Sequence, residues 1–341
     1  MTLLKPTRRD LLKLAAAAPA FAMPVAARAQ LGAPTADNPA HFRFSIGDIR
    51  LTILSDGFFS SPTSGLGVNA DPAEVQAFLS QHFLSPTDGY SHTNHLLIET
   101  GEATILVDVG SGNRWFETTG RLLDNMDAAG VDPADITHVV ITHAHPDHIW
   151  GIRDDFDEAI FPDAEYIVGS DERAFWLQDG LVNKVSAAAQ QFVVGAGNSL
   201  NVDGADWTLA EDGHEIVTGV RVIATPGHTP GVLSTSFTVY DKGYPHAAVL
   251  FGGAGLNFDG VERTQSYIDS IAFLQSLPGV EVNIPNHADS AEVFERAEAL
   301  LERKPDAPHP FVDPEGWSVW LDELMQAAQE KMATELEKEK K

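Results

Sequence analysis

The sequence predicts an α/β fold in which two sheets carry helices on their outer faces. Strand-like and helix-like segments alternate from residue 42 to residue 303, and 43% of the 341 residues are hydrophobic, which is enough for a substantial core. No low-complexity linker and no clean boundary interrupts this stretch. We therefore expect one domain over residues 42–303.

The first half of this domain is expected to alternate strands with two helices. "FRFSIGDIRLTILSDG" predicts a hairpin that turns at Gly47-Asp48, and "DPAEVQAFLSQHF" predicts a helix with Asp71 as its cap and Pro72 in its first position. "TNHLLIETGEATILVDVG" predicts a second pair of strands. A helix that ends at Gly130 should then lead into a buried strand within "ADITHVVITH".

The second half shows the same mixture. A strand is expected in "AEYIVG", followed by helices over residues 171–177 and 185–193. "GVRVIATPGH", "STSFTVYD" and "AAVLFGG" predict three more strands. Helices over residues 265–277 and 291–301 should flank a short strand in "VEVNIPNH".

Residues 304–341 are expected to form a helical extension after the domain. Apolar residues recur there at helical spacing: Trp317, Leu321, Leu324, Ala328 and Met332. We expect this helix to pack on the domain. A homodimer contact through the helix, or a lid over the mouth of the active site, is the alternative.

The first 29 residues resemble a twin-arginine export signal. They combine adjacent Arg8 and Arg9, an alanine-rich apolar run and the small-x-small cleavage pattern Ala27-Arg28-Ala29, and a polar lead over residues 30–41 follows. We expect a periplasmic protein with no stable membrane insertion after cleavage. An uncleaved anchor is the alternative, although the run from Leu11 to Ala27 is short for a bilayer.

The charge and the cysteine count exclude several classes of protein. With 22 Lys and Arg against 49 Asp and Glu, the net charge is −27, so we do not expect nucleic acid as a partner. We expect a small-molecule substrate instead. The chain contains no cysteine, so it forms no disulfide and offers no thiolate to a metal. Any metal must be held by His, Asp or Glu.

The stretch "ITHAHPDHIWG" crowds ligand-type side chains behind an apolar strand. His143 and His145 are two residues apart, so in an extended segment their imidazoles point the same way and can bind one ion. Asp147 and His148 follow where the chain turns into a helix, with Pro146 stiffening the turn. This order of ligand types predicts a metal site.

Two later strand ends each deliver another histidine. "VIATPGHTPG" presents His228 from a loop constrained by glycine and proline, and "VEVNIPNHAD" presents His287. Three loops at strand ends therefore offer histidine.

These residues resemble the metallo-β-lactamase superfamily. Its signature His-x-His-x-Asp-His is met by His143, His145, Asp147 and His148. The two later histidine loops match as well, and "ILVDVG" with Asp108 resembles an early strand motif of the superfamily. The resemblance implies a four-layer αββα sandwich. It also implies that His143, His145 and His228 bind a first metal and that Asp147, His148 and His287 bind a second.

One position departs from many dinuclear members, which place a bridging aspartate after a strand reading like "LFSGD". Here the chain reads "VLFGGAGLNF", with Gly253 or Ala254 at that position. We therefore expect two Zn²⁺ ions, the second of them weakly held, and expect Gly253→Asp or Ala254→Asp to tighten it. The third subclass of metallo-β-lactamases also lacks this aspartate, whereas the N-terminal half is more similar to exported methyl parathion hydrolase and lactonase-type members.

The resemblance and the ligands together predict a zinc-dependent hydrolase. Metal-bound hydroxide would attack an ester, lactone or related acyl bond, with β-lactams and organophosphates less favoured, and Asp147 would orient the nucleophile. An iron-dependent oxidoreductase acting on sulfur compounds is one alternative. A non-catalytic metal-binding descendant is another, prompted by the missing aspartate.

Other residues could serve the substrate or the fold. His92 and His95 could contact substrate, but structural hydrogen bonding is the more common role, and Tyr90 and Tyr267 could act on an oxyanion or a leaving group, although aromatic packing is the default. Phe58-Phe59 and Trp115-Phe116 could line an apolar wall. Specificity is expected in loops near residues 57–71 and 180–203.

Overall fold

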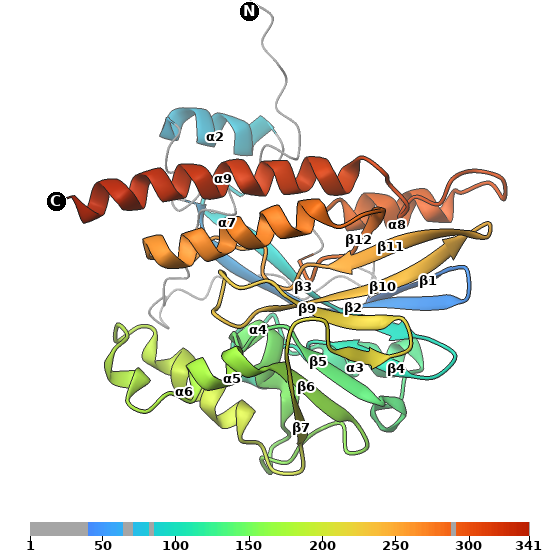
Figure 1. Ribbon diagram of the computed structural model, residues 1–341, viewed down its shortest axis with the longest axis horizontal. Coiled ribbons are helices and arrows are strands. Elements are labelled where there is room, and N and C mark those ends of the chain that lie inside the picture. Colours follow the sequence, from blue (N-terminus) through green and yellow to red (C-terminus); the bar gives the residue numbers. More distant parts are fainter. Residues whose placement is uncertain (1–39, 64–70, 82–84, 288–290, 341) are drawn as a thin grey trace, which may run out of the picture. The chain divides into compact units, whose positions relative to one another are not determined.

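The computed structural model describes residues 40–63, 71–81, 85–287 and 291–340 (Figure 1). The expected export signal and most of the polar lead lie outside the described residues. The described chain divides into two compact units. The β1–β7 unit comprises residues 40–57 and 93–210, and the β8–β12 unit comprises residues 58–92 and 211–340.

A seven-stranded mixed sheet runs in the order β1 to β7. Its strands are β1 His41–Ile46, β2 Ile49–Pro62, β3 Asp88–Glu99, β4 Thr104–Val107, β5 His138–Ile141, β6 Glu165–Gly169 and β7 Asp206–Ala210. The pairs β1–β2 and β3–β4 are antiparallel, and β4 to β7 are parallel. The outer ends of β2 and β3, residues 58–62 and 88–92, are counted with the other unit.

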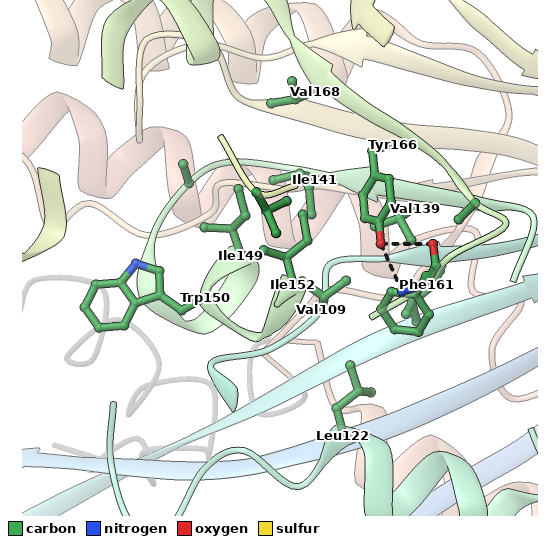
Figure 2. Close-up of a cluster of buried hydrophobic side chains, with 14 of the residues drawn as sticks. Val109, Leu122, Val139, Ile141, Ile149, Trp150, Ile152, Phe161, Tyr166 and Val168 are labelled. Atoms are coloured by element: carbon green, nitrogen blue, oxygen red, sulfur yellow. Dashed lines mark hydrogen bonds between the residues drawn. The ribbon is translucent and has the colours of Figure 1, made fainter. Parts of the chain in front are cut away.

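The helices of the β1–β7 unit follow its parallel strands. They are α3 Leu122–Ala129, α4 Pro146–Ile149, α5 Ser170–Trp176 and α6 Gln190–Leu200. Short 3-10 turns span Gly112–Arg114, Pro133–Asp135, Trp150–Ile152 and Leu181–Asn183. These helices bury apolar residues against the sheet, as Figure 2 shows for Ile149 and Ile152 beside Val139 and Ile141. The strand that precedes the histidine motif is therefore anchored in a closely packed hydrophobic core.

The β8–β12 unit holds a five-stranded mixed sheet in the order β12-β11-β10-β9-β8. Its strands are β8 Glu215–Val217, β9 Val220–Ala224, β10 Leu233–Asp241, β11 Tyr244–Leu250 and β12 Val280–Asn283. Its helices are α2 Pro72–Gln81, α7 Val261–Ser276, α8 Val293–Leu301 and α9 Gly316–Glu339. Among the described strand pairs of this sheet, β11–β12 is parallel and the others are antiparallel.

The C-terminal helix α9 lies beside α7 (Figure 1). Its apolar stripe, including Trp317, Leu321 and Ala328, is buried in a cluster with Tyr267 and Leu274 of α7. The expected packing of this helix on the fold is therefore seen within its own unit. A homodimer through α9 stays a prediction.

The predicted fold class is confirmed, because the chain forms two mixed sheets with helices. Two strands, β7 and β8, are additional to those predicted. The helix expected over residues 185–193 instead spans Gln190–Leu200, so the stretch 180–203 is not simply a loop. The expected helix before Gly130 begins only at Leu122, and Gly130 ends it in the left-handed conformation as predicted.

No helix among the described residues combines the length and the apolar character that crossing a membrane would require.

Asp56 is a buried carboxylate that ties β2 to two turns of its unit. It accepts hydrogen bonds from the Ser111 amide (3.0 Å), the Ser111 hydroxyl (3.1 Å) and the Leu122 amide (3.1 Å). Gly110 has a φ of +70°, and a β-carbon there would lie 2.6 Å from the carboxylate, so only glycine fits. Burial raises the pKa of Asp56 to about 6, although these donors lower it.

We predict that protonation of Asp56 stabilises the fold, because the folded chain binds that proton more tightly than the unfolded chain. The contribution is present below about pH 4 and is lost as the pH rises through about 6. Between about pH 4 and pH 7, the difference in free energy of unfolding between wild type and Asp56→Asn should fall by roughly 2 kcal/mol. Urea unfolding across this range measures it. Asp48→Asn removes an exposed turn carboxylate as the control, and parallel pH profiles for wild type and Asp56→Asn would refute the prediction.

Candidate metal centre

The histidine motif follows β5 at the point where the chain turns into α4. His145 is extended (φ −73°, ψ 159°), and Pro146 occupies the first turn of α4, where its missing N–H costs no helical hydrogen bond. Asp147 and His148 therefore project from a helix end, while His143 projects from the strand end. The ring of His143 lies 4.7 Å from that of His145 and 3.9 Å from that of His148, between centroids. Four of the six expected ligands thus come together within one unit.

A single buried carboxylate, that of Asp108, orients this segment. It accepts hydrogen bonds from the Thr142 amide, the Thr142 hydroxyl and Nδ1 of His148, each at 2.7 Å. Asp108 is fully buried and has a φ of +62°, in the left-handed region that favours glycine. The strain sits beside the motif, where such strain commonly serves function. Asp108 thus holds the strand end and the helix together.

The hydroxyl of Thr142 relays this orientation to His143. Because the hydroxyl has one proton and donates it to Asp108, its oxygen is left to accept from Nδ1 of His143 at 3.0 Å. The Nδ1–H tautomer of His143 follows. Its Nε2 atom is then the ring nitrogen with a lone pair for a metal.

Carboxylates on both sides favour a positive charge at His148. Nδ1 lies 2.7 Å from Asp108, and Nε2 lies 3.3 Å from Oδ2 of Asp147. Burial lowers the pKa of His148, but Asp147 and Asp108 outweigh burial and raise it to about 10. The same arrangement suits a metal cation, because the Asp147 carboxylate and Nε2 of His148 are close enough to bind the same ion.

Glu172 of α5 is a further buried group behind the motif that the sequence did not reveal. Its carboxylate accepts the Ala144 amide at 2.8 Å and the Trp176 indole N–H at 2.6 Å. The Trp176 ring in turn meets His145 edge-on, with 5.7 Å between centroids. The backbone between the first two histidines is therefore held from a second helix.

His228 follows β9 in the other unit and is held by backbone groups. Its Nδ1 lies 2.7 Å from the carbonyl oxygen of Gly255, which can only accept, so Nδ1 carries the proton. Arg263 of α7 donates to the carbonyl oxygens of Gly227 (2.9 Å) and His228. Its guanidinium also stacks over Phe258, 5.2 Å from the ring centroid. His228 is therefore fixed in both ring and backbone.

His287 follows β12 and is oriented in the same way. Its Nδ1 lies 2.9 Å from the carbonyl oxygen of His92, so this imidazole also carries its proton on Nδ1. The backbone carbonyl of His92 thus supports His287, whereas the role of the His92 side chain stays a prediction. Tyr267, considered for catalysis, is fully buried and donates its hydroxyl to Ala254 at 2.7 Å, a structural role.

The residues present fit a zinc ion. Nδ1 of His143, His148, His228 and His287 is in each case engaged by a hydroxyl, carboxylate or carbonyl oxygen. Metal-binding histidines usually donate one ring N–H to such a group and bind the metal through the other nitrogen. Imidazoles with one carboxylate, and no thiolate, suit zinc.

The structure argues against the expectation that aspartate at residue 253 or 254 would tighten a second metal. A β-carbon on Gly253 would lie 2.9 Å from Cβ of His228 and 3.0 Å from both methyl groups of Val232. The side chain of Ala254 packs against the apolar cluster of α7 and α9. Close packing, rather than loss of a bridging ligand alone, explains the glycine at 253.

We predict that Asp108→Asn lowers the affinity for zinc by roughly 10- to 100-fold, because the amide presents N–H donors where the carboxylate accepts three hydrogen bonds. Titration against a chromophoric chelator measures the affinity, and circular dichroism checks the fold. Asp132→Asn is the matched control, since Asp132 accepts one backbone amide at the surface of the same unit. Equal affinities for the two variants would contradict the role given to Asp108.

We also predict that Gly253→Asp weakens zinc binding, because the new side chain displaces His228. The same titration measures the change. Gly101→Asp is the control, because a β-carbon at Gly101 meets nothing within 4 Å. Tighter binding by Gly253→Asp would restore the sequence-based expectation.

Comparison with known proteins begins with a family profile. The profile described as "Metallo-beta-lactamase superfamily" matches residues 88–241, which include the histidine motif and His228. Metallo-beta-lactamase domain-containing protein 1 of Mus musculus is 30% identical over 210 residues, covering 58% of this chain and 66% of its own. Thioesterase pkgB of Emericella nidulans is 27% identical over 222 residues, which cover 54% of this chain and 64% of the thioesterase. The match thus spans just under two thirds of each relative.

Two solved structures illustrate the shared fold. Native FEZ-1 metallo-beta-lactamase from Legionella gormanii has a TM-score of 0.59 at 21% identity, covering 89% of this chain and 98% of its own. AidC, a dizinc quorum-quenching lactonase, has a TM-score of 0.54 at 22% identity, and the match covers 73% of this chain and 92% of AidC. The chain therefore has the fold of the metallo-β-lactamases, and its residues 88–241, which carry the histidine signature, match the profile of that superfamily.

Proposed function

We propose that this protein is a zinc-dependent hydrolase that cleaves an ester, lactone or related acyl bond. The observation that carries the proposal is the shared anchoring of four imidazoles through Nδ1, which presents Nε2 of each as a ligand atom. We assign six residues to two candidate ligand sets, His143, His145 and His228, and Asp147, His148 and His287.

The two ligand sets differ in how much of the charge of a bound ion they neutralise. Three neutral imidazoles leave a bound ion its full charge, whereas Asp147 partly neutralises an ion in the second set. When bound, zinc supplies a hydroxide nucleophile at neutral pH and polarises the carbonyl under attack. A carboxylate has two oxygens, so one oxygen of Asp147 would serve as a ligand while the other would accept a hydrogen bond from the attacking group and orient it.

The names of the relatives support an acyl bond. The Emericella relative is named a thioesterase, AidC a lactonase and FEZ-1 a metallo-beta-lactamase, all of which open a bond to an acyl carbon. We therefore place esters, thioesters and lactones first, and β-lactams and organophosphates after them. The neutral or cationic members of these classes suit a chain of charge −27.

We predict that His143→Ala loses both zinc and turnover, because it removes one of three imidazoles from the first set. Elemental analysis measures the metal, and a panel of lactones, aryl esters, thioesters, β-lactams and phosphotriesters measures turnover. His214→Ala, which removes a histidine outside both sets, should keep both properties. Full activity in His143→Ala would reject the mechanism, and stoichiometric iron with oxygen uptake would favour an oxidoreductase.

We further propose that the protein acts in the periplasm on a small molecule. The Arg8-Arg9 pair and the Ala27-Arg28-Ala29 pattern support export, and the acidic charge argues against nucleic acid as a partner. Cell fractionation with Arg8 and Arg9 changed to lysine tests the route. Unchanged periplasmic accumulation of that variant would exclude the twin-arginine pathway.

A further inference from the structure

Four aromatic side chains of the β8–β12 unit form a cluster of contacting rings, here named the aromatic wall. They are Phe58 of β2, Tyr90 and His92 of β3, and Phe294 of α8. The Phe58 ring meets Tyr90 edge-on at 5.7 Å and His92 at 6.1 Å, and His92 meets Phe294 edge-on at 5.2 Å, between centroids. Two strands and a helix thus contribute to one apolar face.

The aromatic wall is attached to a candidate metal ligand. The backbone carbonyl of His92 accepts the Nδ1–H of His287 at 2.9 Å. The Phe59 ring meets the His287 imidazole edge-on, with 6.4 Å between centroids. The backbone of His92, whose ring belongs to the wall, and the ring of Phe59 therefore both lie next to His287.

The rings of the wall are partly exposed rather than buried in the core. Tyr90 and Phe294 are each 40% exposed, and Phe58 and His92 are half-buried. Large aromatic rings held at the surface beside a polar site provide apolar contact area with little loss of side-chain freedom. Contacts thus run from His287 to the backbone of His92 and from the ring of His92 to Phe294.

We infer that the aromatic wall binds the acyl chain of the substrate, so that the enzyme prefers esters, thioesters or lactones with a long apolar acyl group. This inference rests on the proposed hydrolase function. The carbonyl carbon would sit at the metal ligands, and the chain would extend along Phe58, His92 and Phe294. Each methylene that the wall buries contributes about 0.8 kcal/mol, which is roughly a fourfold gain in kcat/KM.

The kinetic test uses the zinc-loaded full chain and p-nitrophenyl esters with acetyl, butyryl and octanoyl groups. We expect kcat/KM to rise with chain length, and Phe294→Ala to reduce the octanoyl-to-acetyl ratio at least about tenfold. Phe273→Ala is the matched control, because Phe273 is also 40% exposed but lies on α7 outside the wall. A flat length dependence, or an equal loss in both variants, would overturn the inference while leaving the hydrolase proposal standing.

A binding test measures the affinity of the aromatic wall for an alkyl chain without turnover. Ketones such as 2-butanone, 2-hexanone and 2-decanone keep the carbonyl and the chain but have no leaving group, and calorimetry gives their affinities. We expect the preference for 2-decanone over 2-butanone to be lost in Phe294→Ala and kept in Phe273→Ala. If this holds while no ester, thioester or lactone is cleaved, the hydrolase proposal fails and the apolar site stands.

A charged probe separates an acyl-chain site from a cation site, since aromatic rings also bind quaternary ammonium groups. Decyltrimethylammonium is titrated beside 2-decanone. If affinity increases with the length of the alkyl chain among the ammonium ions as well as among the ketones, the inference is supported. Binding of tetramethylammonium that is as tight as that of 2-decanone, and that is lost in Phe294→Ala, would overturn it.

Discussion

The metal centre depends on the hydrogen bonds of one buried carboxylate. Asp108 fixes Thr142 at the end of β5 and His148 at the start of α4, and through the Thr142 hydroxyl it also fixes His143. Its left-handed backbone costs about 1–3 kcal/mol, so the surrounding structure must hold it there. The Asp108 amide does so by donating to the Val140 carbonyl at 2.8 Å. A strained strand end thereby becomes a rigid support for two ligands.

The histidines of the β8–β12 unit reach the same tautomer by a different route. Backbone carbonyls of Gly255 and His92 accept their Nδ1 protons, and a carbonyl cannot donate in return. Arg263 secures the backbone on either side of the first of these histidines. Carboxylate, hydroxyl and carbonyl acceptors thus hold Nδ1 of all four rings, so Nε2 of each ring is the nitrogen left to face a metal.

The sequence predicted the fold class and the ligand types because both leave local patterns. Alternation and glycine turns identified the strands, and the spacing of His143, His145 and His148 identified the motif. Groups that act across long sequence separations left no such pattern: Glu172 behind Ala144, or the carbonyl of His92 on His287. The same limit applies to Gly253, whose packing against His228 only coordinates reveal.

The central claim is that zinc binds through Nε2 of histidines whose Nδ1 atoms are anchored in advance. A crystal structure of the zinc-loaded protein, with anomalous scattering recorded at the zinc edge, tests it most directly. The account predicts zinc bonded to Nε2 of His143 and His228 and to one ring nitrogen of His145, with a second ion on Asp147 and Nε2 of His148 and His287. Zinc bonded through Nδ1 of His143, His148, His228 or His287, or bound away from His228 and His287, would contradict it.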